Sequence, residues 1–184
     1  QEGMAADLNF QAIVDLVGNK LREVFATGDM SISWWDEKAG LLHHLYTYEH
    51  GVRLAASVYA PPLGSGQDRF LRERRVWNLN SRAEQAALGI LTQPGTDQAR
   101  SMLAVPLLAG DRIFGQVVLE NHERDNAFGP AEIRLVSTVA SSMAVALLNA
   151  RSFEAERQRA AELAIINAVQ QALAGELDIQ GVYD

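Results

Sequence analysis

The sequence predicts an α+β fold in which antiparallel hairpins form a sheet and helices occupy both ends of the chain. Two observations concern strands: segments 30–48 and 102–119 each hold two runs of strand-forming residues joined by a short turn. A third concerns helices, because apolar residues recur at helical spacing over 10–25 and again from residue 133 onward.

The first two elements are a helix and a hairpin. The helix has an apolar stripe over 10–25 and ends at Gly28. Residues 30–35 then alternate in polarity and are rich in strand formers. The turn at 36–40 leads into a return strand over 41–48, which completes the hairpin.

The middle of the chain carries weaker signals. Residues 51–67 have no clear period and contain Pro and Gly clusters, which predicts a variable loop or a loop with a short element. Ser81 followed by Glu84 forms a capping box, so a helix is expected from there to residue 88. The other expected elements are a short helix over 70–75, a short strand over 76–79 and a loop over 91–100.

The clearest strand pair is 102–108 with 113–119, joined by a tight turn at 110–111. Pro106 cannot donate to a sheet ladder, so it predicts an edge or a bulge. Gly115 predicts a position where another backbone or a ligand comes close.

A long helix begins at Gly129-Pro130, and nothing stops it before about Gly175. Its length of roughly 65 Å exceeds the roughly 30–35 Å width of a domain of this size, so its far half is expected to project. A lone projecting helix with an apolar seam would be marginal in water, which predicts a parallel homodimer through it. The seam consists of Leu163, Ile166, Val169 and Leu173.

Residues 170–184 restate residues 1–15, with Gln, Ala, Leu, Gln and Asp identical in register. The repeat distance is about one ordinary domain, far too long for a solenoid. We therefore expect this chain to be one unit of a tandem array, ending just inside the next copy.

Composition excludes several classes of protein. The chain has 184 residues, 48% of them hydrophobic, which suffices for one domain with a substantial core. A net charge of −7, with acids and bases mixed, disfavours nucleic-acid and anionic-membrane surfaces. Cysteine is absent, so disulfides, zinc–thiolate sites and thiol nucleophiles are excluded. Without a signal-peptide pattern, and with the longest apolar stretch (139–148) interrupted by serines, we expect a cytoplasmic protein with no membrane span.

In the order and spacing of these elements the chain resembles the GAF domain family. The segments that carry the resemblance are 101–107, 113–121, 127–128 and the helix from Glu132 to Phe153. It implies a central antiparallel sheet of five or six strands with the terminal helices on one face. Loops and short helices would close a ligand pocket on the other face, and a long C-terminal signalling helix would follow. We expect a GAF domain over 1–153, and over 154–184 a connector helix with the start of the next repeat.

Two ligand classes of that family can be compared residue by residue. Cyclic-nucleotide members have Asn-Lys, then Phe, then Asp-Glu after three residues, whereas this chain has Asn121-His122, Phe128 and Glu132-Ile133. The Lys that would pair with the Asp is missing, which weakens a cyclic-nucleotide assignment. Bilin-binding and methionine-sulfoxide-reducing members need Cys, which this chain lacks.

The resemblance implies that a ligand, if there is one, lies between the sheet and the loops of 51–100. His43 and His44 point to opposite faces of a strand; one could be an axial haem ligand, but solvent-facing positions are favoured. The arginines over 69–75 could meet an anion, although a solvated helix face is favoured. The residues expected to line the pocket are Trp34, Tyr46, Tyr48, Phe70, Arg75 and Trp77.

No Ser–His–Asp order, Gly-rich phosphate loop or metal-ligand spacing occurs in the sequence. We therefore predict a non-enzymatic regulatory sensor module of a bacterial signalling protein, with no metal and with an unknown cofactor. Its expected partners are a second copy of itself, a possible small molecule, and a downstream catalytic domain such as a histidine kinase or nucleotide cyclase. The alternative is a module that dimerises and relays a signal with no ligand.

Overall fold

Seven strands and four helices make up the part of the chain that the computed structural model describes, residues 3–25 and 28–182. Side chains are described over 9–25 and 28–175. The elements in chain order are α1 (Gly3–Val24), β1 (Met30–Asp36), β2 (Leu41–Glu49), β3 (Val52–Arg53), β4 (Ser57–Tyr59), α2 (Gly66–Glu73), β5 (Trp77–Leu79), α3 (Arg82–Ala87), β6 (Ser101–Ala109), β7 (Arg112–Asn121) and α4 (Pro130–Val182).

The strands form one antiparallel sheet in the order β3-β2-β1-β7-β6-β5, and β4 also pairs with β2. Both predicted hairpins are present, and they join where β1 pairs with β7. The predicted α+β fold is confirmed. The sheet has seven strands instead of five or six because 52–53 and 57–59, in a segment without a clear sequence period, pair as short strands with β2.

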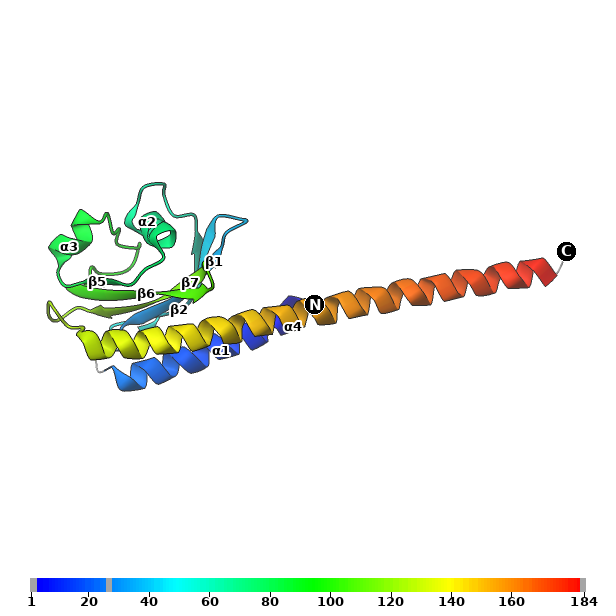
Figure 1. Cartoon of the computed structure of the whole chain (residues 1–184), viewed down its shortest axis with the longest axis horizontal. Coiled ribbons are helices and arrows are strands. Elements are labelled where there is room, and N and C mark those ends of the chain that lie inside the picture. The colour runs from blue at the N-terminus through cyan, green and yellow to red at the C-terminus, as the bar shows by residue number, and fades with distance from the viewer. Residues whose placement is uncertain (1–2, 26–27, 183–184) are drawn as a thin grey trace.

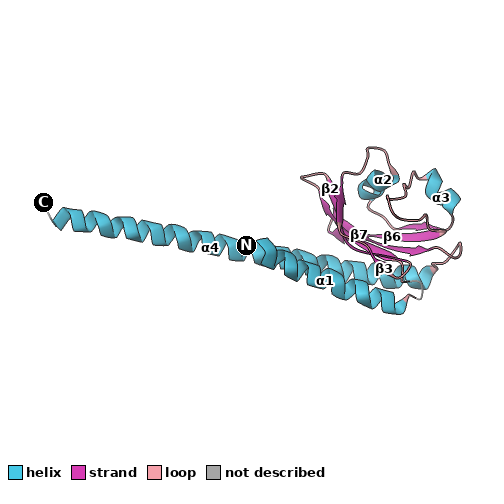
Figure 2. Ribbon diagram, turned by 180° about the vertical axis from the view of Figure 1, so that it is seen from behind, coloured by secondary structure: helices cyan, strands magenta, loops and turns pink. Residues whose placement is uncertain are grey.

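The two faces of the sheet are covered by different elements. Figures 1 and 2 show α1 and α4 packed along one face, with α2 and α3 over the other. The first face forms a continuous apolar core whose fully buried members include Val14, Leu103, Leu107 and Val136. Burying each such side chain stabilises the fold by roughly 1.5–3 kcal/mol, so this face holds the terminal helices on the sheet.

Two residue-level predictions about the second hairpin are confirmed. β7 crosses β1 so closely at Gly115 that a Cβ atom there would overlap the carbonyl oxygen of Ser33. Pro106 lies beyond the three residues of β6 that pair with β5, on an unpaired stretch of that strand's outer edge. Both residues therefore occur where sheet geometry requires them.

The helix that begins at Pro130 continues through Gly175 to Val182, 53 residues or about 80 Å. Its first half packs on the sheet and α1, and its second half extends beyond the body of the molecule (Figure 1). The four residues of the predicted apolar seam are 50–59% exposed. The predicted projection of this helix is confirmed. Of the terminal repeat, residues 1–2 and 183–184 lie outside the described part of the chain.

By length and composition, one helical stretch, Pro130–Gly175, is apolar enough to cross a membrane, with a mean hydropathy of 1.5 over its best window. The expectation that no stretch is long enough is therefore wrong by this measure. Only 28% of that window is buried within the molecule. Length and composition alone do not assign a membrane role to one such helix.

Candidate functional site

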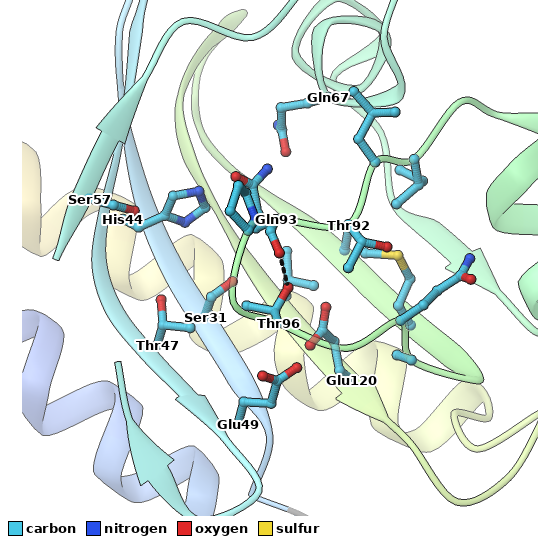
Figure 3. Close-up of a pocket in the computed structure, with 18 of the residues that line it drawn as sticks. Ser31, His44, Thr47, Glu49, Ser57, Gln67, Thr92, Gln93, Thr96 and Glu120 are labelled. Carbon is cyan, nitrogen blue, oxygen red and sulfur yellow. Dashed lines mark hydrogen bonds between the residues drawn. The ribbon is translucent and has the colours of Figure 1, made fainter. Parts of the chain in front are cut away.

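A cavity of about 540 Å³ lies between the sheet and the elements that cover its second face. Its floor consists of side chains from β1, β2, β6 and β7, and its roof consists of α2, α3 and the loop over 88–100. The volume is within the range of about 300–1,000 Å³ typical of small-molecule sites. Figure 3 labels some of the polar residues that surround it: Ser31, His44, Thr47, Glu49, Ser57, Gln67, Thr92, Gln93, Thr96 and Glu120.

A β-bulge decides which side chains of β2 enter the cavity. The pairing of β2 with β1 shifts by one residue at Leu45, between His44 and Tyr46. A one-residue shift moves every later side chain to the other face of a strand. As a result, His44 lies on the same face as Thr47 and Glu49, and all three line the cavity.

His44 lies in the cavity wall with one ring nitrogen unpaired. Its Nδ1 is 2.8 Å from the hydroxyl of Ser33, and its ring stacks on Tyr59 with centroids 5.5 Å apart. Its Nε2 is buried and has no hydrogen-bond partner in the described part of the chain. Burial lowers the pKa of His44, which favours the neutral imidazole. The expectation that both adjacent histidines face solvent is therefore wrong for this one.

A pair of amides joins the roof of the cavity to its floor. The Nε2 of Gln67, on α2, donates to the Oε1 of Gln116, on β7, at 2.8 Å. The Nε2 of Gln116 donates back to the Oε1 of Gln67 at 3.1 Å. Since Gln116 is buried, this reciprocal pair satisfies groups that would be costly to leave unbonded.

Two carboxylates, Glu49 and Glu120, lie next to one another at the end of the cavity away from this amide pair (Figure 3). Glu49 accepts a hydrogen bond from the backbone N–H of Asp97 at 2.7 Å, and its Oε1 lies 3.4 Å from Nε2 of His122. The Nδ1 of His122 lies 3.1 Å from the carboxylate of Asp29. The acidic end of the cavity thus continues into a buried network of acids and imidazole.

The surroundings of Glu120 raise the pKa of its carboxyl group. Burial raises the pKa of Glu120 from an ordinary value of 4.5 to about 7. The neighbouring His122 opposes the rise, whereas the acids Glu49 and Asp29 add to it. Glu120 therefore changes charge near neutral pH.

The same network contains two groups that could hold a metal ion. Glu49, Glu120 and His122 each offer one ligand atom, and these atoms lie within 4.8 Å of one another. Asp29 and His50 form a second such group with the same His122. Carboxylate oxygens and imidazole nitrogens suit ions such as Mn²⁺ and Zn²⁺. No spacing in the sequence predicted these groups, because their members come from three separate segments: Asp29, Glu49 with His50, and Glu120 with His122.

Among the described residues that line the cavity, none is Lys or Arg. The arginines of the α2 region point outward: Arg75 pairs with Glu73 at 2.8 Å, and Arg72 pairs with Asp68 at 2.6 Å. Both arginines are more than 60% exposed, as the solvated-face interpretation predicts. The charges that face the cavity are therefore acidic.

Of the six residues expected in the pocket, the structure brings Phe70 and Trp77 to the cavity. These two rings meet edge to face with centroids 5.4 Å apart and form part of its apolar wall. Arg75 lies outside, beside Glu73. Whether Phe70 and Trp77 contact a ligand stays a prediction.

The other three expected residues lie on the opposite, helix-covered face, which corrects their placement. Trp34 is buried against Phe10 of α1, with ring centroids 4.9 Å apart. Tyr46 is buried below α1 and donates its hydroxyl hydrogen to Asn19 at 2.8 Å. Tyr48 lies under the guanidinium of Arg22, 3.5 Å from its ring centroid. These aromatics anchor helices and do not line the cavity.

The residues that partly match the cyclic-nucleotide pattern have structural contacts instead. The side-chain oxygen of Asn121 accepts from the backbone N–H groups of Glu123 and Arg124 in the turn after β7. Phe128 is buried in the helix-side core. Glu132 accepts from the N–H of Gly129 at the start of α4. None of these three residues lines the cavity.

Comparison with known proteins identifies the family of this fold. The sequence pattern described as "GAF domain" matches residues 9–147. No curated protein matches the chain.

Three solved structures illustrate the likeness in fold. The GAF domain of a phosphoenolpyruvate-protein phosphotransferase from Coxiella burnetii has a TM-score of 0.64 at 18% identity, covering 84% of this chain and 93% of that one. A GAF region of a putative membrane protein from Geobacter sulfurreducens has a TM-score of 0.62 at 20% identity, covering 80% and 98%. The second GAF domain of DevS from Mycobacterium smegmatis has a TM-score of 0.57 at 19% identity, covering 79% and 97%.

Proposed function

This chain belongs to the GAF domain family, and from that premise we propose that it binds a small molecule in its cavity and relays the bound state through α4. GAF domains are regulatory sensor modules of signalling proteins and are generally not catalytic. The observation that carries the proposal is that the two faces of the sheet hold different features. One face borders a cavity of about 540 Å³, and the first half of the projecting helix α4 packs on the other. A ligand can shift such a helix only if it binds more tightly to one arrangement of the helix than to another.

Strand β1 supplies a short path between the two faces. Ser33 contacts the cavity residue His44 through its hydroxyl, at 2.8 Å. The next residue, Trp34, points to the other face, where the guanidinium of Arg151 lies 4.3 Å from its ring centroid. Arg151 belongs to α4 and follows Leu147, the last buried hydrophobic residue of that helix in the described part of the chain. A shift of His44 on ligand binding would therefore reach α4 through two adjacent residues.

A homodimer through the projecting half of α4 completes the proposed relay. The seam of Leu163, Ile166, Val169 and Leu173 is exposed along this half. Each of these side chains contributes roughly 1.5–3 kcal/mol when it is buried, so pairing two copies in parallel stabilises both helices.

Sedimentation velocity at micromolar concentration tests the dimer. We expect a dimer for the natural chain and a monomer for Ile166→Glu combined with Leu173→Glu. The matched control, Gln158→Glu with Gln171→Glu, adds the same charge to exposed positions outside the seam and is expected to stay dimeric. A monomeric natural chain would overturn this part of the proposal.

The repeated terminal sequence supports a tandem arrangement in the parent protein. Residues 170–184 match residues 1–15, and the described parts of these segments lie in α4 and α1. In an array, α4 of one unit would continue as α1 of the next. The last unit would then act on an output domain such as a histidine kinase or nucleotide cyclase.

Ligand binding is tested by denaturing the purified chain, identifying released small molecules by mass spectrometry, and measuring thermal unfolding across a metabolite and nucleotide panel. A true ligand at 100 times its dissociation constant stabilises the fold by about 2.7 kcal/mol. Thr47→Trp, which fills the cavity, is expected to abolish the shift, whereas Val58→Trp on the exposed side of β4 is expected to retain it. If no compound is released and none stabilises the protein, the alternative of a relay without a ligand is favoured.

A further inference from the structure

The charged groups around the cavity have one sign, and this limits the ligand. Its acidic lining residues are Glu49, Glu120 and Asp97, and no Lys or Arg is among the described lining residues. The Asp97 carboxylate is exposed and pairs with His50 at 3.1 Å, so Glu49 and Glu120 are the acids that face the cavity. A phosphate or carboxylate ligand would therefore meet repulsion and find no cation to pair with. A positively charged ligand would find partners already in place.

The spacing of the acidic pair suits a single charged nitrogen. One ligand atom each of Glu49, Glu120 and His122 lie within 4.8 Å of one another, which sets an upper limit on the separation of two of the carboxylate oxygens. A tetrahedral ammonium that donates to two oxygens at about 2.8 Å holds those oxygens about 4.6 Å apart. One amino group, or two N–H groups of an amidine, can therefore bridge both carboxylates.

The rest of the cavity is suited to the body of an organic molecule. Phe70, Trp77, Met102 and Val118 form an apolar wall. In the side wall, the buried Nε2 of His44 has no partner in the described part of the chain. A bare metal ion would use only the acidic end and would leave both the wall and the imidazole without a role.

Building on the proposed function, we infer that the cavity takes a small organic cation, whose amino or amidino group lies between the carboxylates of Glu49 and Glu120. The body of the ligand packs on Phe70 and Trp77, and a polar group on it pairs with His44 Nε2.

Three probes that differ only in head group test the inference: 4-phenylbutylamine, 4-phenylbutan-1-ol and 4-phenylbutyrate. Titrations on the full chain at pH 8, followed by NMR, are expected to show the amine binding at least tenfold more tightly than the other two. Glu49→Gln and Glu120→Gln are each expected to weaken amine binding at least fivefold. Glu37→Gln, in the exposed β1–β2 turn, is the matched control and is expected to bind like the natural chain.

Each outcome distinguishes the inference from the proposal on which it rests. Equal or tighter binding of the alcohol or the carboxylate in the cavity overturns the cation inference and leaves the sensor proposal standing. Binding of none of the three probes counts against both. Stoichiometric binding of Mn²⁺ or Zn²⁺ that Glu49→Gln abolishes, with no preference for the amine, overturns the inference in favour of a metal site. Thermal unfolding confirms that each variant is folded before its affinity is compared.

Discussion

The two faces of the sheet use the same strands for different purposes. Towards α1 and α4, β6 and β7 present Leu103, Val117 and Leu119, each no more than 2% exposed. Towards the cavity, β7 presents Gln116 and Glu120 in the alternating positions. One face is filled by apolar side chains, whereas the other encloses space lined by both polar and apolar groups.

This difference shows how a module can bind without losing its fold. Because side chains alternate along a strand, each β7 residue serves one face only. The apolar face supplies the free energy of folding, and the cavity face can carry groups that cost stability. Predictions that compare the faces therefore test the division directly.

The largest loss of stability is expected from creating a cavity in the core on the helix-covered face of the sheet. Leu103→Ala removes a fully buried side chain from the core under α4 and should lower the free energy of unfolding by about 3 kcal/mol. Its neighbour Met102 belongs to the smaller apolar cluster beside the cavity and already borders open space, so Met102→Ala should cost less, about 2 kcal/mol. Urea denaturation of both variants measures the difference. Equal losses would contradict the division between the faces.

The second prediction concerns how the ionisation of Glu120, on the cavity face, changes the stability of the fold with pH. Because the folded-state pKa of Glu120 is raised to about 7, its contribution to stability is fully present below pH 4.5 and lost as pH rises through 7. Glu120→Gln removes this titration, so the variant should gain about 2 kcal/mol over the natural chain between pH 4.5 and pH 8. The groups facing Glu120 are Glu49, Asp29, His50 and His122, and they are the same in both proteins.

Urea denaturation at the two pH values measures this gain. Glu37→Gln, exposed in a turn, is the control and should show the same pH dependence as the natural chain. A Glu120→Gln variant that is no more stable at pH 8 would mean that Glu120 is not strained by its site.

The sequence predicted the fold better than the site, and the bulge at Leu45 is one reason. Strict alternation puts His44, Tyr46 and Tyr48 on one face, but the bulge moves His44 to the cavity and leaves the tyrosines under α1. No local signal marks the bulge. The hairpins, by contrast, were predictable because their alternation and turns are local.

The middle of the chain is the other reason. The roof of the cavity is built from 51–100, which has no regular period, so its contacts depend on tertiary packing. One missed signal was available: within residues 113–120, Gln116 and Glu120 are the two polar residues, and they stand at positions of equal parity. That pattern indicates a polar cavity facing one side of the hairpin.

A third prediction compares polar groups on the two faces. Tyr46→Phe removes the hydroxyl of a buried ring that donates to the exposed Asn19 at 2.8 Å, and the loss of this hydrogen bond should cost about 1 kcal/mol. Thr47→Val changes the adjacent residue, which faces the cavity, and should cost about 0.5 kcal/mol or less. Thermal unfolding of the pair measures both. A larger loss for Thr47→Val would show that the cavity face contributes more stability than we infer.

The smallest effect is expected in the roof of the cavity. The Ser81 hydroxyl accepts from the backbone N–H of Glu84 at 3.2 Å, and the Glu84 carboxylate accepts from the N–H of Asn80 at 2.7 Å. Ser81→Ala removes the cap of the six-residue helix α3 and should cost about 0.5–1 kcal/mol. The roof contributes little to the core between the sheet and the terminal helices, so we expect Ser81→Ala to increase local unfolding of α3 only. Amide exchange should be two- to fivefold faster in α3 and unchanged in β6 and α4. Faster exchange in β6 as well would show that the roof of the cavity and the helix-covered face of the sheet unfold as one unit. That result would contradict the proposed difference in stability between the two faces.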